Sequence, residues 1–321
     1  MKWLIALLLF AAGPLNAQED ARRWLEDMSV AIRTLDYDGT FVYLYDGRLE
    51  AMRIIHQVDG GVEKERLVSL TGSPREVLRD NKAVTCIMPD SKSVMVGQSR
   101  QPQRFHQVPG DLGSLSRHYR LQVLGDDRIA GHMARIVAIM PRDAYRYGYR
   151  FWIDKDSKML LKSALTDVNG EAIEQVMFTR LELGQGIAGA DLEPSLSGKE
   201  FNWYRQSGSR PQAAAGGGMP DWEVRQRPGG FQMTDYQQRR MRPDSAGTEH
   251  LVFSDGLATV SVYVERVAAD SEPFGGLSSM GAVHAFGAVA DGHQITVVGE
   301  VPAVTVEMMA RSTVTLAGAG Q

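Results

Sequence analysis

The stretch of sequence that decides the fold is residues 40–70, which read TFVYLYDGRLEAMRIIHQVDGGVEKERLVSL. Residues 40–45 are aromatic and β-branched, and residues 48–58 place apolar and polar side chains on opposite sides, as is typical of half-buried strands. Residues 62–70 read as a third strand. The runs are separated by Asp46-Gly47 and by Asp59-Gly60-Gly61, which favour tight hairpin turns. Consecutive strands joined by tight turns pair in an antiparallel way, so this stretch predicts a meander and not a series of β-α-β units.

The same pattern continues through most of the chain. Short apolar and β-branched runs alternate with turn residues, whereas residues 97–111, with Pro102 and Pro109, read as a loop. Residues 111–117 favour a short helix. The further strands expected in this part of the chain are 75–81, 82–88, 93–96, 119–124, 134–140, 147–154, 158–167 and 174–183.

One helix is expected before the first strand, over residues 19–35. Glu19 and Asp20 would open it, at the positive end of the helix dipole, and Asp38-Gly39 would follow its end. Apolar residues recur at steps of three and four along one face of this segment, namely Trp24, Leu25, Met28, Ile32 and Leu35.

A change of composition divides the chain into two folded units. Residues 206–220 are rich in glycine and small residues without periodicity, which is typical of a linker. We therefore expect a first domain over 18–205 and a second over 221–321, of a common domain size. The second domain is expected to hold strands at 250–255, 257–267, 283–289 and 294–300 and a closing helix at 304–311.

The N-terminus has the three parts of a secretory signal peptide. Lys2 precedes an apolar run over residues 4–12, and Gly13-Pro14 and the small Ala17 follow it. The run is shorter than the ~20 residues that cross a bilayer. Residue 18 is glutamine and not cysteine, which argues against the lipid attachment of a lipoprotein. Residues 1–17 thus predict export of a protein that is not lipid-anchored.

Composition narrows the class of protein. The 321 residues are 43% hydrophobic and 23% charged, as in ordinary globular proteins. The net charge of −4 supplies no basic field for nucleic acid. Cys86 is the single cysteine, so no intrachain disulfide can form. Because Cys86 stands in an apolar run, we interpret it as a buried small residue and not as a nucleophile.

The sequence contains partial matches to cofactor and metal motifs, but the residues around each match contradict it. Residues 184–189 match the glycine pattern of dinucleotide-binding loops, but Pro194 blocks the helix that such a loop requires. Residues 154–158 resemble the start of a calcium loop, yet Lys158 stands where an oxygen ligand belongs. The seven histidines lack the spacing of ligands on one helix. We therefore expect a binding protein without a cofactor or a metal, and not an enzyme.

Several segments, taken in order, resemble one family. Residues 147–178 resemble the strand-turn-strand core of LolA/LolB-type lipoprotein carriers, and the whole ordered set is similar to the RseB/MucB family of periplasmic regulators of the envelope-stress sigma factor. The segments that carry the resemblance are YDGTFVY (37–43), SPREV (73–77), YGYRFWID (147–154), KMLLK (158–162), DVNGE (167–171), QVMF (175–178), HLVFSDGL (250–257), SVYVE (261–265) and GAVHAFG (281–287).

The resemblance implies a fold and a function. The fold would be α+β: a large curved antiparallel sheet, a LolA/LolB-like half-barrel with covering helices and an apolar cavity, and then a smaller C-terminal α/β domain with an antiparallel sheet. The protein would be a periplasmic negative regulator that binds the periplasmic part of an anti-sigma factor (RseA or MucA). It would shield that partner from the site-1 protease and sense lipid or lipopolysaccharide. The resemblance leaves open whether the protein forms a homo-oligomer.

Two groups of residues are candidates for binding. Rows of inward aromatic and apolar side chains would suit a cavity for acyl chains, although the same rows would also suit a packed core. These lipid-cavity candidates are Phe41, Tyr43, Tyr45, Met52, Ile54, Tyr149, Phe151 and Ile153. An arginine-rich stretch would suit lipid phosphates or acidic partner residues, or form a solvated basic loop. It comprises Arg225, Arg227, Arg239, Arg240 and Arg242.

Two other functions remain open at this stage. A periplasmic carrier of lipoproteins or lipids would need only the first domain, so the second domain speaks against it. A hydrolase would need carboxylates that converge in space with perturbed pKa values, which a sequence cannot exclude.

Overall fold

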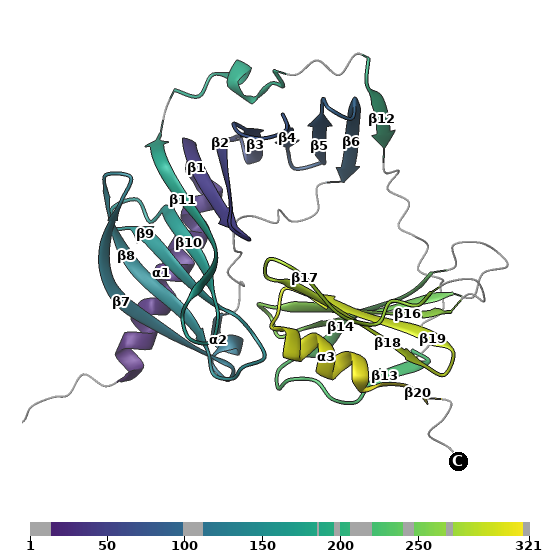
Figure 1. Cartoon of the computed structure of the whole chain (residues 1–321). Coiled ribbons are helices and arrows are strands. Elements are labelled where there is room, and N and C mark those ends of the chain that lie inside the picture. The colour runs from purple at the N-terminus through teal and green to yellow at the C-terminus, as the bar shows by residue number, and fades with distance from the viewer. Residues whose placement is uncertain are drawn as a thin grey trace, which may run out of the picture.

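The computed structural model describes residues 14–98, 112–184, 186–195, 200–205, 220–239, 247–267 and 272–316. Within these ranges the chain forms a large sheet that is antiparallel except for a parallel pair at one edge, a separate six-stranded antiparallel sheet and a two-stranded pair (Figure 1). The expected α+β class with two sheets is thereby confirmed. Apart from residues 14–17 and 220, the expected signal peptide (1–17) and linker (206–220) lie outside the described residues.

The large sheet has 12 strands in the order β12-β6-β5-β4-β3-β2-β1-β11-β10-β9-β8-β7. Its first half is the predicted meander, and its second half returns from the far edge until β11 pairs with β1. The strands are β1 (Tyr37–Tyr45), β2 (Arg48–Asp59), β3 (Val62–Ser69), β4 (Glu76–Arg79), β5 (Ala83–Met88), β6 (Ser93–Gln98), β7 (Tyr119–Ile129), β8 (His132–Pro141), β9 (Gly148–Asp154), β10 (Leu160–Thr166), β11 (Ala172–Leu183) and β12 (Asn202–Arg205).

The predicted hairpin turns have the backbone that their residues favour. Asp46 and Gly47 both adopt positive φ angles, of 47° and 70°, between β1 and β2. Such a turn matches the right-handed twist of the two strands, and aspartate and glycine tolerate it well. The local sequence therefore sets the β1–β2 register, in which Tyr45 pairs with Arg48.

A long helix, α1 (Pro14–Thr34), covers one face of the large sheet (Figure 1). It begins earlier than expected, so Glu19 and Asp20 lie beyond its first turn; proline suits a helix start because its missing N–H has no partner there. Leu25 and Met28 are buried against the sheet. The short helix α2 (Leu112–Leu115) also packs on this core. No described helix is long and apolar enough to cross a membrane.

The second domain is a six-stranded antiparallel sheet with one helix on it, α3 (Ala303–Arg311). Val262, Val297 and Met309 lie in its buried core. Sequence patterning missed β14, β17 and the large sheet's β12, because these edge strands lack a fully buried face. The strands are β14 (Gln232–Arg239), β15 (Thr248–Ser254), β16 (Thr259–Arg266), β17 (Gly276–Met280), β18 (Val283–Ala290) and β19 (His293–Gly299), with β13 (Trp222–Val224) and β20 (Thr313–Thr315) as a separate pair.

A buried ion pair joins the two domains. Arg146, between β8 and β9, and Asp255, in the β15–β16 turn, both have fully buried side chains, and Arg146 Nη1 lies 2.5 Å from Asp255 Oδ2. The Tyr119 hydroxyl donates to the same carboxylate oxygen at 2.9 Å, and Arg146 Nη2 donates to the Gly229 carbonyl at 2.6 Å. The guanidinium also stacks near the rings of Tyr119 and Phe231. Groups from both domains thus surround the Arg146 guanidinium, and the second domain supplies acceptors for its donors.

A second polar contact between the domains contains two glutamates. Glu174 of β11 is buried; it accepts a hydrogen bond from the Tyr43 hydroxyl at 2.6 Å and one from the Ala282 amide of the second domain at 3.3 Å. Burial, and then the charge of Glu174, raise the pKa of Glu300, which follows β19, to about 7. The phenols of Tyr43, Tyr147 and Tyr149 also interact electrostatically with Glu300.

Replacement of Arg146 should destabilise the protein strongly. Arg146→Met leaves the Asp255 carboxylate buried without its counter-charge, which costs about 3–5 kcal/mol in free energy of unfolding. Urea unfolding followed by fluorescence and circular dichroism measures the loss. Adding Asp255→Asn should recover part of it, because no unpaired charge remains. The idea fails if the double variant is less stable than Arg146→Met alone.

The stability contributed by Glu300 should fall as the pH rises. Its folded pKa of about 7 lies above its ordinary value of 4.5, so the folded protein holds a proton that the unfolded chain releases. This contribution is complete below the ordinary pKa and is lost as the pH rises through about 7. Glu300→Gln should therefore stabilise the protein, relative to wild type, by about 1–3 kcal/mol at about pH 8 and much less at about pH 5.

Urea unfolding of both proteins across this pH range tests the effect. Glu223→Gln, at an exposed position of the same domain, serves as the control. A stability difference between Glu300→Gln and wild type that does not change with pH would contradict the assignment.

Candidate functional site

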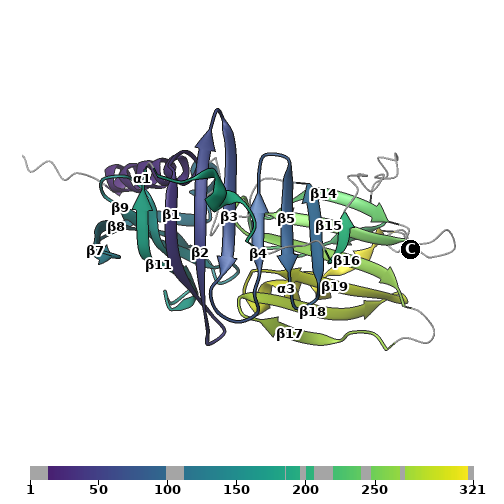
Figure 2. The ribbon, with the colours of Figure 1, turned by 90° about the horizontal axis from the view of Figure 1, so that it is seen from above.

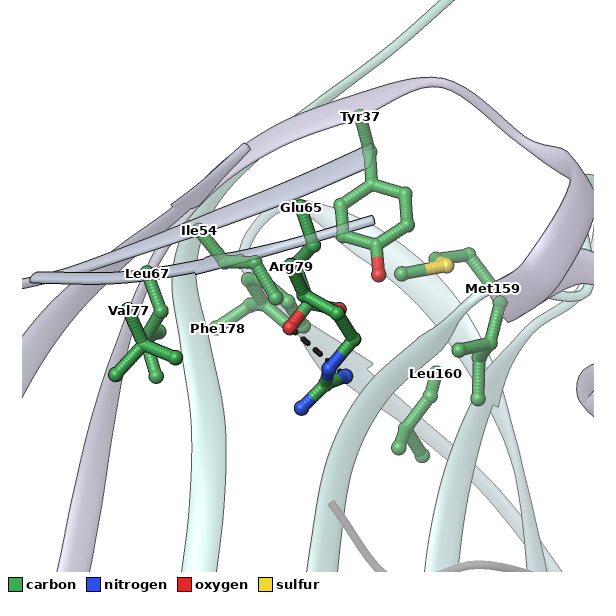
Figure 3. A pocket seen from close by; sticks show the side chains of 10 residues that line it. Tyr37, Ile54, Glu65, Leu67, Val77, Arg79, Met159, Leu160 and Phe178 are labelled. Carbon is green, nitrogen blue, oxygen red and sulfur yellow. Dashed lines mark ion pairs between the residues drawn. The ribbon is translucent and has the colours of Figure 1, made fainter. Parts of the chain in front are cut away.

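An apolar pocket opens between the large sheet and α1 (Figure 3). Its volume is about 120 Å³, which is below the ~300–1,000 Å³ usual for ligand pockets. A longer ligand would therefore have to extend beyond it. The pocket is lined by Ile32, Tyr37, Ile54, Glu65, Leu67, Val77, Arg79, Met159, Leu160 and Phe178.

An ion pair lies among these apolar side chains. Glu65 of β3 and Arg79 of β4 face each other in register, and Arg79 Nη1 lies 3.2 Å from Glu65 Oε1 (Figure 3). The Nε and Nη1 atoms of Arg79 are buried and have no well-aligned hydrogen-bond acceptor within the described residues. Glu65 supplies the counter-charge of this guanidinium, whereas the Nε donor stays without an acceptor among the described residues, and an unsatisfied donor in a dry site is costly.

The apolar lining continues along the sheet toward its edge. Each of its members is the register partner of the next across neighbouring strands, so all lie on one face. Exposure rises along the row, from 3% at Ile54 to 45% at Met95 and 58% at Tyr204. The row consists of Ile54, Leu67, Val77, Cys86, Met95 and Tyr204. Cys86 is half-buried and not fully buried as expected, and this partial burial raises the pKa of its thiol.

The opposite face of β2, β3 and β4 is partly covered by the chain itself. A 3₁₀ turn, η1 (Gly189–Leu192), lies over β2 and β3 when the molecule is seen from above (Figure 2). Arg66 Nη1 donates to the Asp191 carbonyl at 2.9 Å, and its Nη2 lies 3.0 Å from Glu76. Ser195 caps the same Glu76 carboxylate. The apolar row therefore lies on the face that this segment leaves uncovered.

The eight lipid-cavity candidates lie in several environments. Ile54 alone among them lines the pocket. Tyr149, Phe151 and Ile153 are buried beneath α1, and Phe41 and Met52 belong to the core beside the pocket. Tyr43 and Tyr45 are half-buried and stack on each other, with hydroxyls that donate to Glu174 and Glu50 respectively.

The structure describes only part of the arginine cluster. Arg225 is exposed after β13. Arg227 donates to the carbonyls of Val224 and Phe231, at 3.2 and 3.1 Å, and so holds its own turn. The backbone of Arg239 ends β14, whereas its side chain, and all of Arg240 and Arg242, lie outside the described residues.

The sequence reading missed the ionic groups that organise the pocket and the contact between the domains. Glu65 stands two residues from Leu67, and Arg79 two residues from Val77, so each shares a strand face with an apolar pocket residue. A charge that replaces an apolar residue on an inward face is the signal that points to this pair. Arg146 and Asp255 offer no such signal, because they lie 109 residues apart in the chain.

Both domains of this architecture match those of known proteins. Residues 20–196 match the MucB/RseB N-terminal domain, and residues 218–314 match the MucB/RseB C-terminal domain. The sigma factor AlgU regulatory protein MucB of Pseudomonas aeruginosa is 31% identical over 96% of this chain and 95% of its own length. The sigma-E factor regulatory protein RseB of Escherichia coli is 26% identical over 97% and 96%.

Solved structures agree with the sequence matches over both domains. The complex of Pseudomonas aeruginosa MucA and MucB is similar with a TM-score of 0.71 and 29% identity, covering 92% of this chain and 99% of that one. MucB in complex with MucA(peri) gives a TM-score of 0.70, and a crystal structure of MucB gives 0.60. The relatives are named as regulatory proteins, and this chain belongs to the MucB/RseB family.

Proposed function

We propose that this chain is a negative regulator of an envelope-stress sigma factor. It binds the periplasmic part of a membrane-anchored anti-sigma factor of the RseA/MucA type and shields it from site-1 proteolysis. The observation that carries the proposal is the likeness, over both domains, to MucB in complex with MucA. The periplasm is the compartment that this partner requires, and the expected signal peptide suits it.

Shielding follows from mass action. A partner segment held by this protein is unavailable to a protease, so the accessible fraction falls as the concentration of the regulator rises above Kd. Both domains contribute to the surface, and the buried Arg146–Asp255 pair holds them in one arrangement. The TM-scores support this arrangement as the binding form, because they are higher with the two MucA complexes than with MucB in the third structure.

Lipid would act on the regulator by binding in the apolar pocket. An acyl chain would enter beside Ile54 and Phe178 and continue along the row toward Met95, and the Nε donor of Arg79 would meet a polar oxygen of the ligand. A lipid releases the partner only if it binds the released form more tightly than the complex. Arg225, which is exposed, supplies a positive charge for acidic partner residues or lipid phosphates.

The pocket by itself would equally serve a carrier of lipids or lipoproteins. The two functions differ in one respect: in a carrier, lipid in the pocket has no effect on cleavage of the anti-sigma factor. Measurement of cleavage with and without lipid separates them.

Protection of the partner is directly measurable. At a regulator concentration of about 100 times Kd, cleavage of the purified periplasmic segment by the site-1 protease should slow about 100-fold, because about 1% of the segment is free. Titration by calorimetry supplies Kd, and bovine serum albumin in place of the regulator controls for crowding. Absence of binding at tens of micromolar would overturn the proposal.

Filling the pocket should abolish lipid binding. Val77→Trp places an indole where an acyl chain would lie, so bound radiolabelled fatty acid should fall by at least about tenfold, as expected when a well-packed site is blocked. Thr85→Trp is the matched control, because Thr85 pairs with Leu78 on the opposite face of the sheet.

The anti-sigma segment should bind Val77→Trp as it binds the wild type in the absence of lipid. If Val77→Trp and wild type bind equal amounts of fatty acid, the lipid site lies elsewhere. The binding of the anti-sigma segment is then judged separately, by the protection assay.

A further inference from the structure

The face of the large sheet opposite α1 carries two basic side chains around one tryptophan. Trp152 lies on β9, Arg150 precedes it by two residues on the same strand face, and Lys162 of β10 is its register partner. Lys162 Nζ lies 4.4 Å from the centre of the indole ring, and Arg150 Cζ lies 6.0 Å from it. No described helix lies on this side of β8, β9 and β10 in Figure 1.

The register brings the two cations together over a small residue. Ala164 is the partner of Arg150 and stands two residues from Lys162, so the cations occupy diagonal positions about 7–8 Å apart at the backbone. Ala164 is only 2% exposed, because the longer side chains around it extend over its methyl group. Gln175 of β11 pairs with Ala164 from the other side and adds an amide donor.

The charges of this cluster are not balanced. Among the described residues, neither Arg150 nor Lys162 forms an ion pair with a carboxylate. The Nε atom of Arg150 is buried without a hydrogen-bond acceptor, and its Nη2 reaches only the Gly170 carbonyl, at 3.4 Å. Asp127 on this face already accepts hydrogen bonds from the Trp152 indole N–H, at 2.9 Å, and from the Arg128 amide.

The environment of Lys162 is consistent with a missing anion. Burial is the main cause that lowers the pKa of Lys162; the charge of Arg150 lowers it further, and that of Asp127 partly opposes the change. Two like charges that are partly removed from water repel each other, and a bound anion would remove that repulsion. Arginine supplies a planar fork of donors and lysine a mobile point charge, and phosphate is the group that accepts both.

We propose that Arg150, Lys162 and Gln175 bind a phosphate group over Ala164, on the outer face of the sheet. The site is separate from the apolar pocket, which lies on the opposite face, and it does not depend on the proposed regulatory function. The phosphate can come from a soluble phosphate or from a phospholipid headgroup, and the experiment distinguishes these sources.

The indole N–H of Trp152 reports on the site by nuclear magnetic resonance. The full chain is titrated with sodium phosphate against sodium chloride at constant ionic strength, and Trp152→Phe assigns the signal among the five tryptophans. The Trp152 signal should shift in a saturable way. Each of Arg150→Gln and Lys162→Gln should raise the apparent Kd about tenfold, since each removes one charge-assisted contact. Arg120→Gln and Lys64→Gln, each made singly, remove the same single charge elsewhere and should leave Kd unchanged.

Vesicles identify the source of the phosphate group. Phosphatidylcholine vesicles with and without phosphatidic acid are sedimented with wild type and with Lys162→Gln. Cosedimentation that requires both phosphatidic acid and Lys162 supports a headgroup site, whereas saturable binding of phosphate alone supports a soluble ligand. The proposal is overturned if the Trp152 signal does not saturate with phosphate, or if both single variants titrate as the wild type does.

Discussion

The Arg146–Asp255 ion pair is the contact on which the arrangement of this molecule depends. Two fully buried charges are costly to remove from water, and the cost is offset only when geometry and further hydrogen bonds satisfy both partners. Here Tyr119, Gly229 and Asp143 supply those bonds, and the first two of them come from different domains. Because the pair is satisfied only when the domains meet in one way, it selects their orientation as well as their contact.

The second contact between the domains is of a different kind. The proximity of Glu174 to Glu300, combined with burial, favours a proton held at the contact near neutral pH. A buried ion pair and a carboxyl group, Glu300, whose charge depends on pH thus both lie between the two domains. The Arg146–Asp255 contact fixes how the domains meet, and the protonation of Glu300 adjusts the stability of that arrangement.

The two faces of the large sheet are chemically distinct. One face buries α1 and then continues as an apolar row that becomes more exposed from Ile54 to Tyr204. The other carries Arg150, Trp152 and Lys162 over β9 and β10. Because side chains alternate along a strand, a single sheet can present an apolar surface on one side and a basic surface on the other.

The sequence alone determined the features that arise from neighbouring residues. Asp46-Gly47 specified its hairpin, the apolar spacing from Trp24 to Leu35 specified most of α1, and the ordered motifs indicated the family. Edge strands such as β12 were not predicted, because no fully buried face imposes an apolar pattern on their sequence. Only the tertiary structure decided that β11 pairs with β1 and that Arg146 meets Asp255, since both contacts join residues more than 100 positions apart, between which local patterning carries no information. The pairing of Glu65 with Arg79 likewise depended on the register of two strands, and register follows from the whole sheet.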